Sequence, residues 1–178
     1  MPGMNHKGQS VKVEGGKVDL DTLLTEMTRQ GRNAGPLLLN KHWPELSIDD
    51  KKAALLEVWL MAEFPTQAMP WQIWLHYFKQ VGFISDDPNI EKPLQPLTIY
   101  RGAVKHKRKG MSWTQDKELA AWFASRFNGA NNNKCFLYTT DIEPDYILAI
   151  ITGVNGREGE TEVIIDPEGL QNIKRLEL

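Results

Sequence analysis

The stretch DDPNIEKPLQPLTIYRG, residues 86–102, decides the fold class of this chain of 178 residues. Its first part holds three prolines and predicts a linker, because proline interrupts regular structure. Its last part, Leu97–Tyr100, is rich in β-branched and aromatic side chains and predicts a strand. Helical patterns precede this stretch and strand patterns follow it, so we expect an α+β fold rather than alternating βαβ units.

Before the linker, apolar residues recur at helical spacing in three segments, which predicts helices over residues 19–31, 47–64 and 71–80. Asp19 or Asp21 and Ser47 are the expected N-caps, and Pro70 suits the first turn of the third helix. Gly35 and Pro36 are expected to end the first helical region, with 37–44 as a packed connector. The aromatic face of the third helix is interpreted as core packing in preference to a ligand site.

After the linker, the sequence predicts one helix over residues 116–127 and further strands over 134–141, 146–152, 161–166 and 173–178. We therefore expect a mostly antiparallel β core. Three parts follow: an arm over residues 1–18, a helical lobe over 19–92 and a β-rich core over 93–178. The two lobes are expected to form one structural unit, because the β half alone would be short.

Composition excludes several classes of protein. The net charge is -2, so no strong overall field attracts polyanions, and Cys135 is the single cysteine, which excludes an internal disulfide. The four histidines lack metal-ligand spacing and no phosphate-binding glycine loop is present, so we expect no metal and no nucleotide kinase. No apolar run approaches the roughly 18 residues of a membrane span, which predicts a soluble, cytoplasmic protein.

Three short pieces carry chemistry in combination: Tyr100-Arg101-Gly102, Ser112-Trp113-Thr114 and Glu160-Thr161-Glu162. Each alone has an ordinary structural explanation as a surface cation, a helix cap or a solvent-facing strand start. In an extended segment, however, the carboxylates at positions i and i+2 lie on the same side. An arginine can bind a diphosphate bidentately, and paired carboxylates suit a substrate that develops positive charge.

In this order, the three pieces resemble the arginine-serine-glutamate class of mono-ADP-ribosyltransferases, which includes clostridial binary-toxin enzymes and vertebrate arginine-modifying ectoenzymes. The resemblance covers residues 97–166, with Ser-Trp-Thr in place of that class's Ser-Thr-Ser. It implies a helical N-terminal lobe packed on a two-sheet β core, with NAD in the cleft between them as the ADP-ribose donor.

The resemblance implies a role for each matching residue. Arg101 would bind the NAD phosphates, and Ser112 would hydrogen-bond Glu162. Glu162 would contact the ribose 2′-hydroxyl and stabilise the oxocarbenium-like cation, whereas Glu160 would be the general base. Thr114 would support the strand-to-helix turn.

Further residues would contact NAD according to the same resemblance. Tyr100 and Gly102 flank the arginine, and Trp113, Trp122 or Phe123 could stack on the nicotinamide or the adenine. Phe123 fits the core equally well. The loop over residues 153–159 would be the turn that recognises the target.

The resemblance leaves several functions open. Glu160 in the first place of Glu-x-Glu favours a protein arginine as acceptor in a bacterial or phage toxin or effector, with an antitoxin or immunity protein as a further partner. The basic run Lys105–Lys109 lies near Arg101 and keeps a nucleic-acid base open as acceptor, and water is a third acceptor. A non-enzymatic interaction module built from the tryptophan-rich helical half is the alternative from another class.

Overall fold

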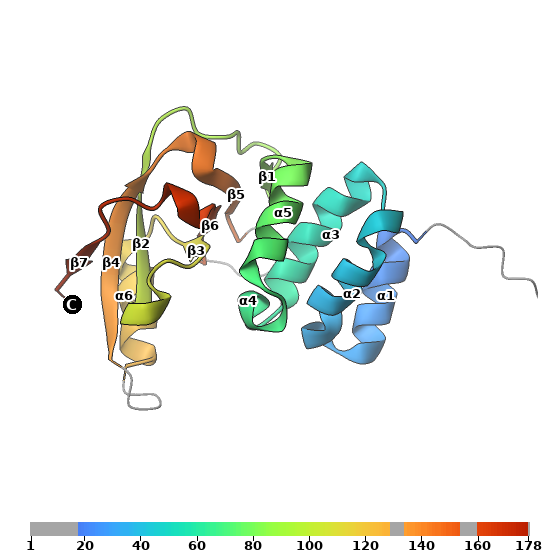
Figure 1. The fold of residues 1–178 in the computed structure, drawn as a ribbon, viewed down its shortest axis with the longest axis horizontal. Coiled ribbons are helices and arrows are strands. Elements are labelled where there is room, and N and C mark those ends of the chain that lie inside the picture. Colours follow the sequence, from blue (N-terminus) through green and yellow to red (C-terminus); the bar gives the residue numbers. More distant parts are fainter. Residues whose placement is uncertain (1–17, 129–133, 154–159, 178) are drawn as a thin grey trace, which may run out of the picture.

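The computed structural model describes residues 18–128, 134–153 and 160–177; residues 1–17 of the predicted arm lie outside them. The N-terminal half is helical (Figure 1). Its helices are α1 (Leu20–Gln30), α2 (Gly35–His42), α3 (Ile48–Met61), α4 (Pro65–Ala68) and α5 (Trp71–Val81). No helix in the described ranges has the length and apolar character that crossing a bilayer requires.

Two predicted helix starts are confirmed by their side-chain caps. The Thr22 backbone N–H donates to the Asp19 carboxylate at 2.9 Å, and the Asp50 N–H donates to the Ser47 hydroxyl at 3.1 Å. Each cap satisfies a backbone donor that has no partner within the helix. Pro70 is the N-cap of α5 instead of a residue of its first turn.

The connector expected over residues 37–44 is wrong, because most of it belongs to α2. Pro36 lies in the first turn of this helix, where its fixed φ favours helix and its missing N–H is not needed. Gly35 permits close packing, since a Cβ there would lie 2.7 Å from Met27 Cε and 3.2 Å from Val58 Cγ1. Gly35 and Pro36 therefore begin a helix instead of ending one.

The C-terminal half forms two mostly antiparallel sheets, which confirms the α+β class. The first sheet has the order β1 (Ile84–Ser85), β5 (Ile147–Ile151), β6 (Glu162–Ile165) and β3 (Ser112–Trp113). The second has the order β2 (Leu97–Val104), β4 (Cys135–Ile142) and β7 (Lys174–Leu176). Short 3₁₀ turns are η1 (Arg32–Ala34), η2 (Trp43–Glu45), η3 (Lys105–Lys107), η5 (Pro144–Tyr146) and η6 (Pro167–Gly169).

The helical half packs against the first sheet, as Figure 1 shows for α5 and the strands beside it. Phe78 of α5 shares one buried apolar cluster with Ala149 of β5 and Ile164 of β6. Directly after α5, β1 pairs in parallel with β5. One hydrophobic core therefore continues from the helices into the sheet.

Helix α6 (Lys117–Arg126) packs on the second sheet at Gly102 of β2. A Cβ at Gly102 would lie 2.4 Å from the Ala120 carbonyl oxygen and 2.5 Å from the Ala124 nitrogen, so only glycine permits this approach. A second core between the sheets contains Ile99 and Trp113. The packing holds α6 next to Tyr100 and Arg101.

Candidate functional site

A pocket of about 280 Å³ lies where α3 and α4 face β2, β3, β6 and α6. The four candidate catalytic residues all line it: Arg101, Ser112, Glu160 and Glu162. Of the other residues expected to contact NAD, five line it too: Tyr100, Gly102, Trp113, Thr114 and Phe123. Trp122, the third aromatic candidate, is not among the lining residues. Ligand sites usually begin near roughly 300 Å³, so this pocket is at the small end of that range, and a larger ligand would extend over its rim.

Arg101 on β2 is held by backbone carbonyls. Its Nη1 donates to the Ser112 carbonyl and its Nε donates to the Lys107 carbonyl at 3.3 Å. Gly110 lies against the guanidinium, since a Cβ there would be 2.5 Å from Nη2. Desolvation lowers the pKa of Arg101 to about 10, and attraction to Glu162 opposes that shift, so the side chain remains cationic at neutral pH.

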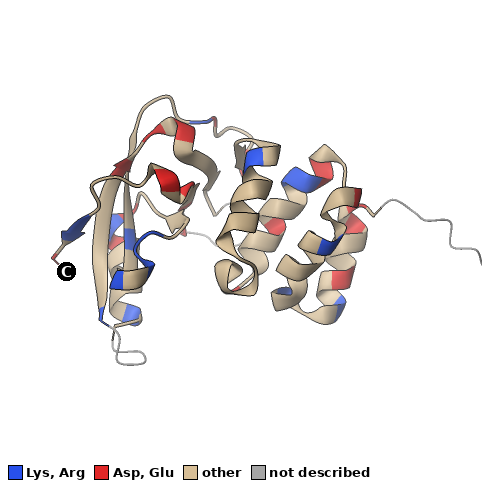
Figure 2. Cartoon of the chain, in the orientation of Figure 1, with Lys and Arg blue, Asp and Glu red and all other residues tan. Residues whose placement is uncertain are grey.

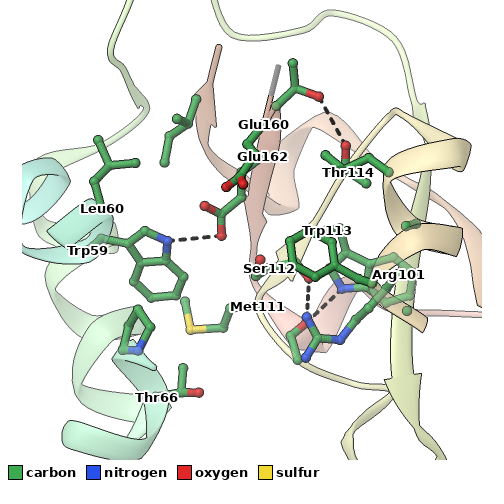
Figure 3. Close-up of a pocket in the computed structure, with 18 of the residues that line it drawn as sticks. Trp59, Leu60, Thr66, Arg101, Met111, Ser112, Trp113, Thr114, Glu160 and Glu162 are labelled. Atoms are coloured by element: carbon green, nitrogen blue, oxygen red, sulfur yellow. Dashed lines mark hydrogen bonds between the residues drawn. The ribbon is translucent and has the colours of Figure 1, made fainter. Parts of the chain in front are cut away.

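Glu162 is the first residue of β6, where it pairs with Ile151 of β5. Its Oε1 accepts a hydrogen bond of 3.1 Å from the indole Nε1 of Trp59 on α3, which Figure 3 shows across the pocket. Trp59 is 4% exposed and packs edge-on against Trp74. A buried indole from the helical half therefore positions this carboxylate, whose charge attracts the Arg101 cation.

Glu160 and Glu162 point to the same side of their segment, as Figure 3 shows. Between them, the Thr161 hydroxyl lies 3.1 Å from the Thr114 hydroxyl. The Thr114 Oγ1 also accepts from the Asp116 backbone N–H at 3.0 Å, directly before α6. Thr114 thus links the acidic segment to the turn that starts α6. Both carboxylate residues are half-buried.

Ser112 and Trp113 lie on β3, which pairs with β6 in the register Ser112–Ile164 and Trp113–Val163. Trp113 is 2% exposed, and its indole donates to the Gly110 carbonyl at 2.8 Å, so it closes the β2–β3 connection and belongs mainly to the core. The Ser112 carbonyl holds Arg101. A hydrogen bond from the Ser112 hydroxyl to Glu162 stays a prediction.

Besides the buried Trp59 and Trp113, two half-buried aromatic residues line the pocket, Tyr100 on β2 and Phe123 on α6. Phe123 contacts the exposed Trp122 edge-on at 4.9 Å and stacks with Phe127 at 6.2 Å between ring centroids. It therefore belongs to a partly exposed aromatic group instead of the central core. Of the predicted recognition loop over residues 153–159, residues 154–159 lie outside the described residues.

The sequence predicts a cleft between the two lobes, but it does not identify the residues that the helical half contributes to this site. Trp59, Pro65 and Thr66 line the pocket opposite Arg101. Trp59 falls in the apolar stripe of its helix, so its spacing indicates core packing and nothing else. A buried indole N–H needs an acceptor, but the sequence does not say which one.

The described ranges hold no cluster of three or more His, Cys, Asp or Glu side chains that could bind a metal ion. The residues that line the pocket instead include one arginine, three glutamates (Glu63, Glu160 and Glu162), hydroxyl-bearing side chains and aromatic rings. Comparison with family models, with curated proteins and with solved structures finds no match to this chain. Any function must therefore be argued from the site itself.

Proposed function

We propose that this chain is an NAD-dependent mono-ADP-ribosyltransferase that breaks the nicotinamide glycosidic bond and transfers ADP-ribose to a macromolecular acceptor. One observation carries the proposal: a cationic Arg101 and the Glu160–Glu162 pair, distant in sequence, line a single half-buried pocket. Partial burial of these charged side chains costs hydration energy. A ligand that binds to all three of them would give a reason for placing them together in one pocket.

The guanidinium fits a diphosphate. It has five N–H donors, of which the carbonyls of Ser112 and Lys107 engage two within the described residues. These two bonds fix the plane of the group, and the remaining donors suit the two phosphates of the NAD substrate. Arg101 would thus bind the donor in a set orientation.

The carboxylates suit the chemical step. The bond between ribose C1′ and the nicotinamide nitrogen breaks, and its electron pair leaves with neutral nicotinamide. Glu162, held by Trp59, stabilises the positive charge that develops on the ribose. The acceptor nucleophile then bonds to C1′ while Glu160 takes its proton as general base.

Nicotinamide release from NAD tests this proposal. Replacing Glu162 with Gln should lower the rate by roughly 100-fold or more, because it removes the charge opposite the developing cation. Glu160→Gln should impair transfer to an acceptor more than NAD hydrolysis. The matched control is Glu57→Gln on the exposed face of α3, which should retain wild-type rates.

Two results would contradict the proposal: no nicotinamide release by the wild-type chain with or without cell extract, or full activity of Glu162→Gln. Equal loss of transfer and hydrolysis in Glu160→Gln would contradict only its role as base. The toxin or effector setting, with a neutralising partner, stays a prediction from the resemblance.

A further inference from the structure

One end of the β half concentrates positive charge although the chain as a whole is slightly acidic. The segments 105–110, 122–128 and 134–136 contain Lys105, Lys107, Arg108, Lys109, Arg126 and Lys134 and no Asp or Glu. The pairing of Val104 with Cys135 places the end of β2 beside the start of β4. The Cys135 N–H donates to Asn128 Oδ1 at 3.4 Å, which brings the end of α6 to the same place. Figure 2 shows these cations at this end.

Exposed aromatic rings accompany these cations on α6. Trp122 is 49% exposed and Phe127 is 41% exposed. The Arg126 guanidinium lies 4.9 Å from the Trp122 ring centroid and 5.7 Å from that of Phe127. Phe123, in contact with both rings, lines the pocket. The aromatic group therefore leads from the protein surface into the candidate site.

The basic run is also joined directly to the pocket. The Lys107 carbonyl accepts from Arg101, and Gly110, one residue beyond the run, packs against the same guanidinium. Lys105, Lys107 and Lys109 are exposed. A long polyanion bound along this run would therefore pass the rim of the pocket.

We propose that this basic–aromatic surface, formed by residues 105–109, Trp122, Arg126, Phe127 and Lys134, binds single-stranded nucleic acid and presents one of its bases as the ADP-ribose acceptor. The proposal rests on the proposed function. Lysines bind phosphates and aromatic faces stack with bases, a combination typical of single-strand sites. A protein acceptor would not need both features next to each other. A single strand is favoured because a paired base would first have to be unpaired and unstacked, at a cost in free energy, before it could enter the pocket.

The transfer step balances with a base nitrogen as nucleophile. The nitrogen bonds to ribose C1′, nicotinamide leaves with the electron pair of the broken bond, and Glu160 receives the proton of the nitrogen. Guanine matches Glu160 best, because its ring N–H and exocyclic amine form a guanidine-like edge that can donate two hydrogen bonds to one carboxylate. Because this edge of guanine resembles the guanidinium of arginine, Glu160, which favours an arginine acceptor, also suits a guanine base.

Binding of a labelled 20-nucleotide single strand, as RNA and as DNA, tests the surface. The double variant Lys105→Gln/Lys109→Gln should flatten the slope of log K against log salt by about 1.4, since each phosphate contact in a single strand contributes roughly 0.7. Trp122→Ala should weaken binding roughly 5- to 150-fold through lost stacking. The duplex of the same sequence should bind more weakly than the single strand.

Matched controls make the same kinds of substitution at exposed residues that lie outside the basic–aromatic surface. Lys52→Gln/Lys92→Gln removes two exposed cations, and Trp71→Ala removes a ring that is 37% exposed on α5. Both should bind the strand as the wild type does. No binding of either strand, or equal loss in the controls, would overturn the proposal.

Transfer is tested with labelled NAD and a mixture of single strand and arginine-rich protein. We expect label on the strand, removed by nuclease but not by protease, and at least tenfold less label when inosine, which lacks the exocyclic amine, replaces guanosine. Label on protein alone would overturn the nucleic-acid proposal and leave the proposed function intact. Absence of nicotinamide release would instead reject the proposed function.

Discussion

Trp59 has two structural roles: its ring packs in the helical core, and its indole N–H donates a hydrogen bond to the candidate site. Its ring lies in the helical core, 5.0 Å from the Trp74 centroid and 5.6 Å from that of Phe78, while its indole N–H reaches Glu162. Helical spacing predicts the first role from local sequence. The second depends on a carboxylate 103 positions away, so no local pattern contains it.

Replacing Trp59 with Phe tests the second role. The ring packing is largely kept, but Glu162 loses a donor, and a hydrogen bond to a charged group contributes about 1.5–3 kcal/mol. We expect kcat for nicotinamide release to fall roughly tenfold or more with little change in KM. Trp43→Phe is the control, because that indole donates to Gln80 instead. Equal kcat values for the two variants would contradict a positioning role for Trp59.

At the scale of elements, the sequence predicts what local rules determine. Asp19 and Ser47 mark helix starts because their side chains accept from backbone N–H groups of the same helix. The sequence does not predict the strands β1 and β3, because a segment of two residues is too short to show the alternation of apolar and polar side chains that indicates a strand. Their strand geometry comes from neighbours in the sheet. Residue type and order identify the three pieces of the site in the sequence. Their convergence in space depends on the pairing of β6 with β3 and β5, which the sequence does not show.

The contact between α6 and β2 gives a prediction at this scale. Gly102→Ala should destabilise the fold by about 1–3 kcal/mol, because the added Cβ meets backbone atoms of α6 that cannot move separately. Gly110→Ala is the comparison, since the three atoms nearest to its added Cβ belong to the Arg101 side chain, which can shift without moving the backbone. It should leave stability nearly unchanged but raise the KM for NAD. Denaturant unfolding and nicotinamide release measure the two effects, and similar stability losses would contradict this distinction.

At the scale of the whole molecule, the site exists because two halves dock. Trp59 and Thr66 come from the helices, and Arg101 and Glu162 come from the strands. The sequence predicts a change from helices to strands at the proline-rich linker, but not the faces that meet. A contact outside the pocket helps to hold them: Lys79 Nζ of α5 lies 2.6 Å from Asp166 Oδ2, directly after β6.

This contact predicts how stability depends on pH. The hydrogen bond to Asp166 raises the pKa of Lys79 above 10.5, although desolvation opposes the shift. A lysine with a raised pKa stabilises the folded state below its unfolded pKa, and this contribution is lost as pH rises through the folded pKa. Because Lys79 is half exposed, Lys79→Gln should lower the free energy of unfolding at neutral pH by only about 1 kcal/mol.

The difference in unfolding free energy between wild type and Lys79→Gln should shrink as pH rises above 10.5, where the ammonium loses its proton. Denaturant unfolding at neutral and at alkaline pH measures this difference. Lys52→Gln on the exposed face of α3 is the control and should stay within about 0.5 kcal/mol of wild type throughout. Asp166 is 2% exposed and still accepts the Glu168 backbone N–H at 3.0 Å when the cation is lost, which agrees with the modest cost expected for Lys79→Gln. A difference that stays constant with pH would show that Lys79 acts through packing instead of charge.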